Sequence, residues 1–346
     1  MLKRQKSLIG LDVGTHSAKA IELTQVGSEY VITAYAQRDV PSESARAECV
    51  VEMLQGHVFR TRRVATAVSG KSVIVRYLTM VKMADDDLRN AVRFEADKYI
   101  PFDIDEVVLD AQRLDDGGRR FEGLAENEMR VLLVAVKRSL IEDHVGLIQS
   151  IGLQPHLIDV DAFALGNAFE ARSRLAPGAE QAGRVTALID VGANKTNINV
   201  LRGEALCFTR EIYLGGDDFT AAVSKRLGCD QQQAEQLKRQ PGEHADALRD
   251  AVLPSIDDLG NEIHLSFDYF ENQFDQAVDD VFLSGGGAAL PLVAETFEKI
   301  FDKRTRHWDP TENLKVDEDC VDAAALRANA GQLAIVMGLA GRLRKD

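Results

Sequence analysis

Several signatures of well-known protein classes are missing from this sequence. Its 346 residues include only four cysteines, too widely spaced to form a Cys-Xaa-Xaa-Cys pair. None of its seven histidines belongs to a His-Glu-Xaa-Xaa-His motif. In a chain of this length, isolated cysteines are typical of small buried residues in a reducing compartment. The composition therefore argues against a structural or catalytic zinc site.

Basic charge and long apolar runs are also scarce. Acidic residues exceed basic ones, which gives a formal net charge of −14. Nucleic-acid binding depends on clustered Lys and Arg, so this balance disfavours DNA or RNA as the main partner. No stretch reaches the roughly 18 consecutive apolar residues of a transmembrane helix, and no secretory signal is recognisable. We expect a cytoplasmic chain that reaches a membrane only through a partner or a weak surface contact.

The length of the chain predicts more than one hydrophobic core, because single cores rarely grow beyond about 250–300 residues. Pro, Gly and Ala gather at 176–183, which we interpret as the seam between two lobes. We therefore expect a first lobe over residues 1–175 and a second lobe over residues 184–346. Helical patterns fall at 85–99, 217–276 and 321–344, and the last is predicted as one long helix.

The most informative pattern is a short apolar run that ends in Asp-Val-Gly and occurs twice, at 12–14 and 190–192. A strand that ends in this way places a carboxylate at the edge of a cleft. The glycine lets the following backbone amides turn toward a phosphate. A single copy would be an ordinary strand-end turn. Two copies facing each other would surround a polyphosphate, with Asp12 and Asp190 holding a hydrated Mg²⁺.

Three further patterns could bear on phosphate binding. Lys19 lies in the β-type run after the first turn, where it either reaches the phosphates or is a solvated strand lysine. Ser-Gly-Gly-Gly at 284–287 follows an apolar strand, so a ligand could approach its backbone closely. A Rossmann loop is disfavoured because Leu290 occupies the third glycine position. Residues 69–72 resemble part of a P-loop, but Ala65 occupies the position of the first glycine that a P-loop requires, so a P-loop is disfavoured.

Other candidate residues have ordinary explanations when taken one at a time. Gly215 and Gly216 precede a helical pattern and are typical of a turn with a capped helix start. Glu235 and Lys238 are three apart on the next helical pattern, where a surface pair contributes little stability. Asp161 begins another helical pattern and is typical of an N-cap.

Taken in this order, the motifs resemble those of the actin-like ATPase superfamily over nearly the whole chain. The resemblance implies an α/β fold of two lobes, each with a ribonuclease-H-like β-sheet and helices. It implies ATP or ADP between the lobes, with Mg²⁺ held through water by Asp12 and Asp190. Asp161 falls where the superfamily carries its water-positioning Glu or Gln. The implied nucleotide-binding residues are Gly14, Thr15, Lys19, Gly192, Asn194, Thr196, Gly215, Gly216, Glu235, Lys238, Gly285, Gly286 and Gly287.

Within that superfamily the sequence resembles the PilM family of type IV pilus assembly proteins. Three stretches carry this resemblance, at 9–23, 70–102 and 190–200. It implies a small insertion in the first lobe at about 75–138, of the type found in the cell-division protein FtsA. It also implies a helical subdomain at about 217–276 in the second lobe and a C-terminal helix that returns toward the first lobe.

The same resemblance implies a protein partner. The N-terminal cytoplasmic tail of a PilN-like inner-membrane protein is expected in a groove that includes Tyr99, Ile100, Pro101 and Phe102. The chain would then be peripheral at the inner membrane without inserting into it. Other pilus platform or motor proteins are further candidate partners. Without the resemblance, these four residues would be a helix end, a proline turn and core aromatics.

Together these expectations describe an adaptor in which nucleotide sets cleft closure and so biases the partner groove. Asp161 is shorter than the usual Glu or Gln, so we expect a slow ATPase at most. Two alternatives stay open: an actin-like ATPase or kinase, and a nucleotide-dependent filament-forming protein, which leaves self-association open as well. The sequence does not decide between a type IV pilus and a related secretion or competence machine.

Overall fold

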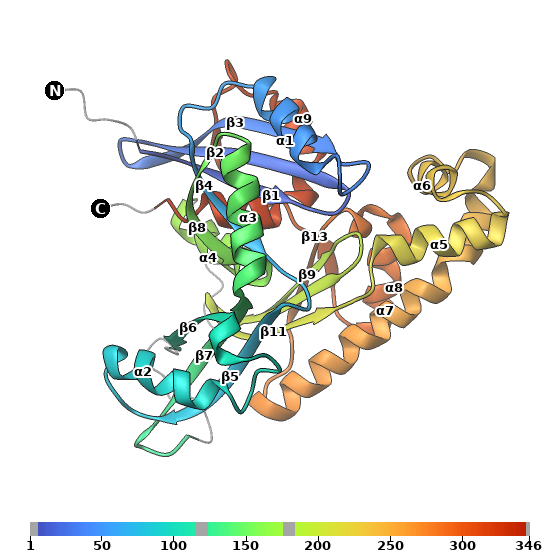
Figure 1. The fold of residues 1–346 in the computed structure, drawn as a ribbon. Coiled ribbons are helices and arrows are strands. Elements are labelled where there is room, and N and C mark those ends of the chain that lie inside the picture. Colours follow the sequence, from blue (N-terminus) through green and yellow to red (C-terminus); the bar gives the residue numbers. More distant parts are fainter. Residues whose placement is uncertain (1–5, 115–123, 176–183, 344–346) are drawn as a thin grey trace.

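Two large β-sheets and one small sheet organise the computed structural model, which describes residues 6–114, 124–175 and 184–343 (Figure 1). The seam predicted at 176–183 lies outside these residues. The α-helices are α1 (Arg46–Gln55), α2 (Asp85–Ala96), α3 (Arg138–Ser150), α4 (Asp161–Leu175), α5 (Gly216–Leu227), α6 (Gln231–Arg239), α7 (Ala245–Phe274), α8 (Pro291–Phe301), α9 (Ala323–Ala328) and α10 (Ala334–Ala340). Short 3₁₀ turns occur at Ile104–Glu106, Gly242–His244, Gly287–Ala289 and Ala330–Gln332.

The first large sheet has the strand order β14-β3-β2-β1-β4-β8. Its strands are β1 (Ser7–Val13), β2 (Ser17–Val26), β3 (Glu29–Asp39), β4 (Arg63–Val68), β8 (Gln154–Val160) and β14 (Lys315–Val316). β1, β2 and β3 form an antiparallel meander, whereas β1, β4 and β8 run parallel. Leu8, Ile9 and Leu11 of β1 are buried, because both faces of this central strand are covered. That double burial explains the continuous apolar run that precedes Asp12.

The second large sheet repeats this arrangement in the order β11-β10-β9-β12-β13. Its strands are β9 (Val185–Val191), β10 (Thr196–Arg202), β11 (Ala205–Ile212), β12 (Asp280–Ser284) and β13 (Thr305–His307). β9, β10 and β11 are antiparallel, and β9, β12 and β13 are parallel. Asp12 pairs with Lys19 across the first hairpin, and Asp190 pairs with Asn197 across the second. The two Asp-Val-Gly motifs therefore occupy equivalent places in the two sheets.

A small antiparallel sheet, in the order β5-β7-β6, lies at the lower left of Figure 1. Its strands are β5 (Val73–Val81), β6 (Val107–Arg113) and β7 (Glu128–Lys137). Helix α2 ends at Ala96, before the predicted end at residue 99, and buries Leu88, Val92 and Ala96. These three side chains share one helix face because they are four residues apart. They pack with the small sheet in a hydrophobic core of its own.

Helices α4 and α10 join the two large sheets. A single hydrophobic cluster contains Leu8 and Ile21 from the first sheet, and Leu188 and Phe282 from the second. Side chains of α4 and α10 belong to the same cluster. The two sheets therefore share one core at this place, which sets how their edges face each other.

The prediction of one long helix over 321–344 is wrong. The structure has α9, a 3₁₀ turn and α10 in its place. The backbone carbonyl of Gly331 accepts a hydrogen bond from the amide of Gly285, at 2.8 Å. A continuous helix would have used that carbonyl internally, so this tertiary contact breaks the helix between α9 and α10.

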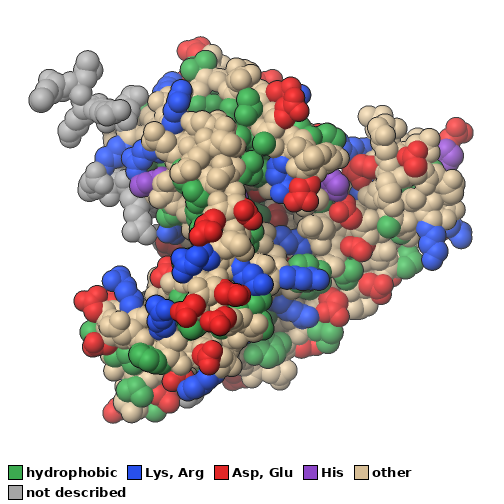
Figure 2. Space-filling model, viewed as in Figure 1, with side chains coloured by type: hydrophobic (Ala, Val, Ile, Leu, Met, Phe, Trp, Pro, Cys, Tyr) green, Lys and Arg blue, Asp and Glu red, His purple; other side chains and the backbone are tan. Residues whose placement is uncertain are grey.

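None of the helices within the described ranges has both the length and the hydropathy of a transmembrane segment. On the face seen in Figure 2, acidic and basic side chains are interspersed over most of the surface. This agrees with the charged composition of the sequence.

The contact between α4 and α10 generates a stability prediction. A Cβ atom added at Gly338 in α10 would overlap the carbonyl oxygen of Ala164 in α4. Backbone cannot move aside cheaply in a packed core, so Gly338→Ala should lower the free energy of unfolding by about 3 kcal/mol.

The matched control is Gly146→Ala in α3, where an added Cβ meets nothing within 4 Å. That change should stabilise the protein by about 0.5–1 kcal/mol, since glycine is a poor helix former. Urea unfolding of both variants measures the two effects. Equal and small changes would contradict the close packing of α4 on α10.

Candidate functional site

The two Asp-Val-Gly motifs meet across one cleft of about 1030 Å³. Each motif ends a strand and enters a turn that closes in the same way. The amide of Gly14 donates to the carbonyl of Ser17 at 3.0 Å, and the amide of Gly192 donates to that of Lys195 at 2.9 Å. A cleft of this volume lies at the upper end of the range for small-molecule sites, roughly 300–1,000 Å³. We refer to these two segments, 12–17 and 190–195, as the phosphate turns.

The carboxylates of the phosphate turns have different partners. The Asp12 carboxylate accepts from the Lys19 ammonium at 3.1 Å, and the Lys19 side chain is only 11% exposed. The Asp190 carboxylate accepts from the Ser284 hydroxyl at 2.8 Å. Burial raises the pKa of Asp190 to about 6, although Ser284 and the Lys19 ammonium act in the opposite direction. The cleft thus holds a carboxylate that is costly to ionise until a cation approaches it.

Glycines let three backbone segments converge at the second phosphate turn. Gly285 has φ of +92°, and a Cβ there would overlap the carbonyl oxygen of Val191. A Cβ at Gly215 would lie 2.7 Å from the carbonyl oxygen of Gly192. Gly285 is therefore a position that only glycine fills without strain. The close approach leaves backbone groups, rather than side chains, lining this part of the cleft.

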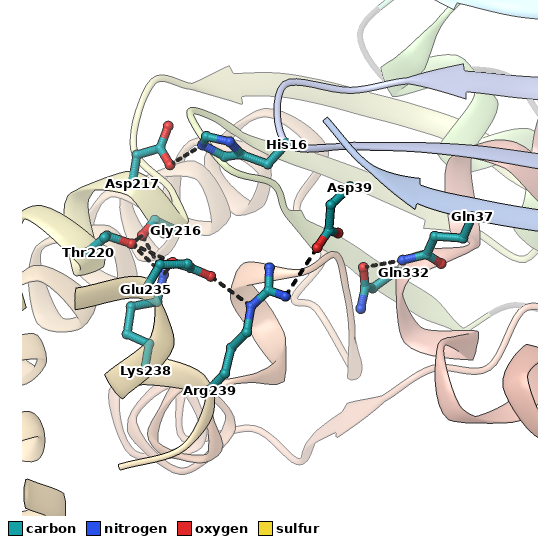
Figure 3. A network of polar contacts seen from close by, with 10 residues as sticks. All are labelled: His16, Gln37, Asp39, Gly216, Asp217, Thr220, Glu235, Lys238, Arg239 and Gln332. Carbon is teal, nitrogen blue, oxygen red and sulfur yellow. Dashed lines mark hydrogen bonds and ion pairs between the residues drawn. The ribbon is translucent and has the colours of Figure 1, made fainter. Parts of the chain in front are cut away.

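The wall beside the second phosphate turn comes from α5 and α6 (Figure 3), and the amide of Gly216 in α5 donates to the Gly192 carbonyl at 2.9 Å. The Lys238 ammonium donates to the Gly216 carbonyl at 2.9 Å, to the Thr220 hydroxyl at 2.7 Å and to the Glu235 carboxylate at 2.7 Å. Burial disfavours the ionised form of Glu235, but hydrogen bonds from Lys238, Thr220 and Arg239 outweigh it and lower the pKa of this group. The wall thus presents a fixed ion pair, not the mobile surface pair that the spacing alone suggested.

Polar contacts cross the cleft between elements of the two lobes (Figure 3). His16 after β1 lies 2.8 Å from the carboxylate of Asp217 in α5. Arg239 at the end of α6 lies 3.5 Å from the carboxylate of Asp39 at the end of β3. Both pairs are largely exposed, so each contributes little stability. They do show that the two walls are within side-chain reach of each other.

Sequence reasoning missed Lys195. It belongs to the second phosphate turn, lines the cleft and is 15% exposed. Its ammonium binds the Asp161 carboxylate at the start of α4 and, at 2.6 Å, the Glu211 carboxylate of β11. Burial alone would lower the pKa of Lys195, but these two carboxylates outweigh it and raise the pKa. The sequence did contain a signal for this residue, namely a lysine inside the segment 190–195 that follows the second Asp-Val-Gly motif.

Most of the predicted nucleotide and metal residues line the cleft, and two do not. Those that line it are Asp12, Gly14, Thr15, Lys19, Asp161, Asp190, Gly192, Asn194, Gly216, Glu235, Lys238, Gly285, Gly286 and Gly287. Thr196 is fully buried, and its hydroxyl donates to the carbonyl of Leu214 at 2.8 Å. Gly215 packs against the second phosphate turn from behind.

The donor set fits a polyphosphate with a hydrated divalent cation. No group of three or more His, Cys, Asp or Glu side chains suited to a metal occurs in the described residues. Mg²⁺ commonly uses one or two carboxylates plus water and phosphate oxygens, which is what Asp12 and Asp190 offer. Asn197 lines the same cleft, and its side-chain oxygen is buried without a hydrogen-bond partner among the described residues. Such an orphaned acceptor is expected at a site that a ligand or water completes.

The predicted partner segment lies outside the cleft, just after α2. Ile100 is 7% exposed and belongs to the core of the small sheet, whereas Tyr99 is 41% exposed. Pro101 is exposed, and the Lys137 ammonium lies 4.5 Å from the centre of the Phe102 ring. The segment therefore combines a buried anchor with accessible apolar surface.

Comparison with known proteins identifies the family of this chain. The family model described as type IV pilus assembly protein PilM matches residues 10–344. The chain is similar to a solved structure described as the PilM-PilN type IV pilus biogenesis complex, with a TM-score of 0.84 and 29% sequence identity. That match covers 97% of this chain and 98% of the other.

More distant relatives share the fold. Cell division protein FtsA of Streptococcus pneumoniae serotype 2 (strain D39 / NCTC 7466) is 24% identical over 289 residues, or 75% of this chain. The chain spans 61% of the length of that relative. Ethanolamine utilization protein EutJ from Carboxydothermus hydrogenoformans has a TM-score of 0.57 at 14% identity, covering 97% of this chain and 89% of its own. MreB5 of Spiroplasma citri bound to ADP has a TM-score of 0.51 at 11% identity, covering 96% and 94%. The actin-like ATPase fold expected from the motifs is confirmed.

The raised pKa of Asp190 predicts a pH-dependent effect of Asp190→Asn in metal-free buffer. Folding raises this pKa from 3.8 to about 6, so the folded protein binds the proton more tightly than the unfolded chain. The contribution of Asp190 to stability therefore falls as the pH rises through this window, and stays low above it. The variant should exceed the parent protein in free energy of unfolding by about 2–3 kcal/mol at pH 7.5.

Denaturant unfolding at pH 7.5 and pH 4 checks this expectation, and the advantage should shrink at the lower pH. Asp86→Asn, at a side chain that is 94% exposed, controls for the loss of one negative charge. A variant that is equally destabilised at both pH values would show that Asp190 is not a strained carboxylate.

Proposed function

Because the chain belongs to the family of type IV pilus assembly proteins PilM, we propose that it is a nucleotide-binding adaptor of the pilus assembly platform. In this role it binds ATP or ADP with Mg²⁺ in the cleft. It also binds the N-terminal cytoplasmic tail of a PilN-like membrane protein in a nucleotide-sensitive way. The observation that carries the proposal is the pair of equivalent phosphate turns that line one cleft.

Each part of the cleft has a proposed task. Asp12 and Asp190 hold Mg²⁺ through water, and the amides of the two phosphate turns bind phosphate oxygens. Lys19 contributes positive charge on the floor of the cleft. Glu235 and Lys238 contact the ribose hydroxyls: Glu235 accepts directly, and Lys238 donates by releasing one of its three present partners. The glycine backbone at 285–287 allows the base to approach.

Hydrolysis is expected to be slow or absent. Asp161 lies at the cleft, but its carboxylate is held by the Lys195 ammonium and also accepts from the amide of Ala162 at 2.8 Å. A carboxylate committed to these partners is poorly placed to orient water. Nucleotide binding, without hydrolysis, would then change how far the two lobes close.

The partner proposal has two supports. The solved relative with 29% identity is described as a complex of PilM with PilN. The segment after α2 has the exposed Tyr99 beside the buried Ile100, which suits an extended peptide that needs an apolar contact. Binding to a membrane-anchored tail would hold the chain at the cytoplasmic side of the inner membrane.

Tail binding can be tested with a synthetic N-terminal peptide of the PilN-like protein. Tyr99→Ala should weaken peptide binding by about tenfold, because a half-exposed aromatic at an interface supplies much of its apolar contact. Fluorescence anisotropy with a labelled peptide measures the affinity.

Phe94→Ala is the matched control, since Phe94 of α2 is 81% exposed and lies outside the predicted segment. It should leave the affinity within about twofold, as expected for a residue outside the interface. Unchanged binding by Tyr99→Ala, or an equal loss in both variants, would place the peptide elsewhere.

A further inference from the structure

Lys195 belongs to a polar cluster in which Asp161 is buried, Lys195 and Glu211 are partly buried, and Tyr213 is 47% exposed. The cluster consists of Lys195, Asp161, Glu211 and Tyr213, and we call it the Lys195 cluster. The Lys195 ammonium donates to Asp161 and to Glu211, and the Tyr213 hydroxyl donates to the other Glu211 oxygen at 2.5 Å. The side chains of Asp161 and Glu211 are 11% and 23% exposed. The cluster therefore joins α4, the second phosphate turn and β11 inside the cleft wall.

The ammonium of Lys195 has capacity left for a ligand. A lysine ammonium has three N–H donors, and the two carboxylates use two of them. Two carboxylates compete for this one ammonium, so a phosphoryl group that approaches it displaces one of them. Holding such charges out of water is costly unless every partner is well placed. A cluster with these properties lowers the stability of the fold, and a ligand-binding role would explain its presence.

Among the described residues that line the cleft, the side chains with a Lys or Arg charge are Lys19, Arg46, Lys195, Lys238, Arg239 and Arg249. Lys238 is held by three partners, and Arg239 is bound to Glu235 and Asp39. Lys195 is the one that belongs to a phosphate turn. It is therefore placed to meet phosphate charge that Lys19 does not neutralise.

The two ends of the second phosphate turn have different neighbours. Gly192 at one end accepts from the amide of Gly216, whose carbonyl accepts from Lys238, whereas Lys195 at the other end binds Asp161 at the start of α4. A nucleotide whose ribose meets Glu235 and Lys238 would direct its phosphates along this turn toward Lys195. A third phosphoryl group would then reach the Lys195 cluster, and a diphosphate would end before it.

We propose that Lys195 is the residue by which the cleft distinguishes a nucleoside triphosphate from a diphosphate, an inference that rests on the proposed nucleotide site. The free N–H of Lys195 binds the terminal phosphoryl group in competition with Glu211. A charge-assisted hydrogen bond in a poorly solvated site is strong enough to give a clear preference. Lys195 acts here on binding and needs no bond to be broken.

Titration calorimetry with Mg²⁺ and either ADP or the slowly hydrolysed analogue AMPPNP tests the proposal. Lys195→Met keeps the length of the side chain and removes its charge. It should weaken AMPPNP binding by about tenfold and change ADP binding by less than about twofold, because only the triphosphate reaches Lys195.

Glu211→Gln provides the opposite test in a protein that keeps the lysine. It removes one of the two competing carboxylate charges, so AMPPNP should bind about threefold or more tightly while ADP changes little. If Lys195→Met leaves two carboxylates unpaired and fails to fold, Glu211→Gln still tests the proposal. A lysine with a purely structural role predicts the same loss for both nucleotides in both variants, and that result would overturn the proposal.

Nucleotide binding by the parent protein distinguishes a failure of this proposal from a failure of the proposed nucleotide site. If it binds both nucleotides and Lys195→Met leaves their affinity ratio unchanged, the inference about Lys195 is wrong and the nucleotide site stands. If the parent protein binds neither nucleotide, the proposed function and this inference are both wrong.

Discussion

The packing of α4 against α10 is the constraint on which the rest of the structure depends. These helices approach so closely that glycine is required at Gly338, and their side chains fill one core with both large sheets. This shared core fixes the sheets relative to each other, because close-packed interiors resist small shifts. The ends of β1 and β9 then face the same cleft, and so do their phosphate turns. Neither turn would be distinctive alone.

Charge inside the cleft is arranged around this geometry. Asp12 is paired with Lys19, Asp190 with a hydroxyl, and Lys195 with two carboxylates. Buried groups of this kind cost stability and are common where a protein awaits a ligand. Toward the small sheet, the Lys71 ammonium lies 5.4 Å from the ring of Tyr213. Lys71 lies two residues before β5, so polar contacts extend from the cleft toward the small sheet, whose core includes Ile100 of the partner segment.

The sequence was informative wherever a local pattern determined the outcome. The apolar run before Asp-Val-Gly predicted both central strands and both turns, because a buried strand followed by a glycine turn is a local arrangement. Most of the nucleotide and metal residues implied by the resemblance also line the cleft, as expected for motifs on strand ends. Family and fold followed from the same residues.

Long-range contacts explain what the sequence did not predict. Lys195 meets Asp161 and Glu211, which are 34 and 16 residues away, so no short motif joins them. The closing helix breaks at Gly331 because Gly285, far away in the chain, binds its carbonyl. Thr196 has the expected place after the second turn, but its hydroxyl satisfies a buried carbonyl and does not reach the cleft. Each of these differences from expectation involves a partner that becomes a neighbour only in the folded chain.

The central claim is that nucleotide in the cleft changes how the partner segment binds its tail. The most direct measurement is the affinity of the labelled PilN-like tail peptide for the parent protein, with no nucleotide and with saturating ATP–Mg²⁺. If the cleft and the partner segment are coupled, nucleotide should change the peptide affinity by about fivefold or more, as for an ordinary coupling between two sites. An identical peptide affinity while ATP–Mg²⁺ is shown to be bound would contradict it.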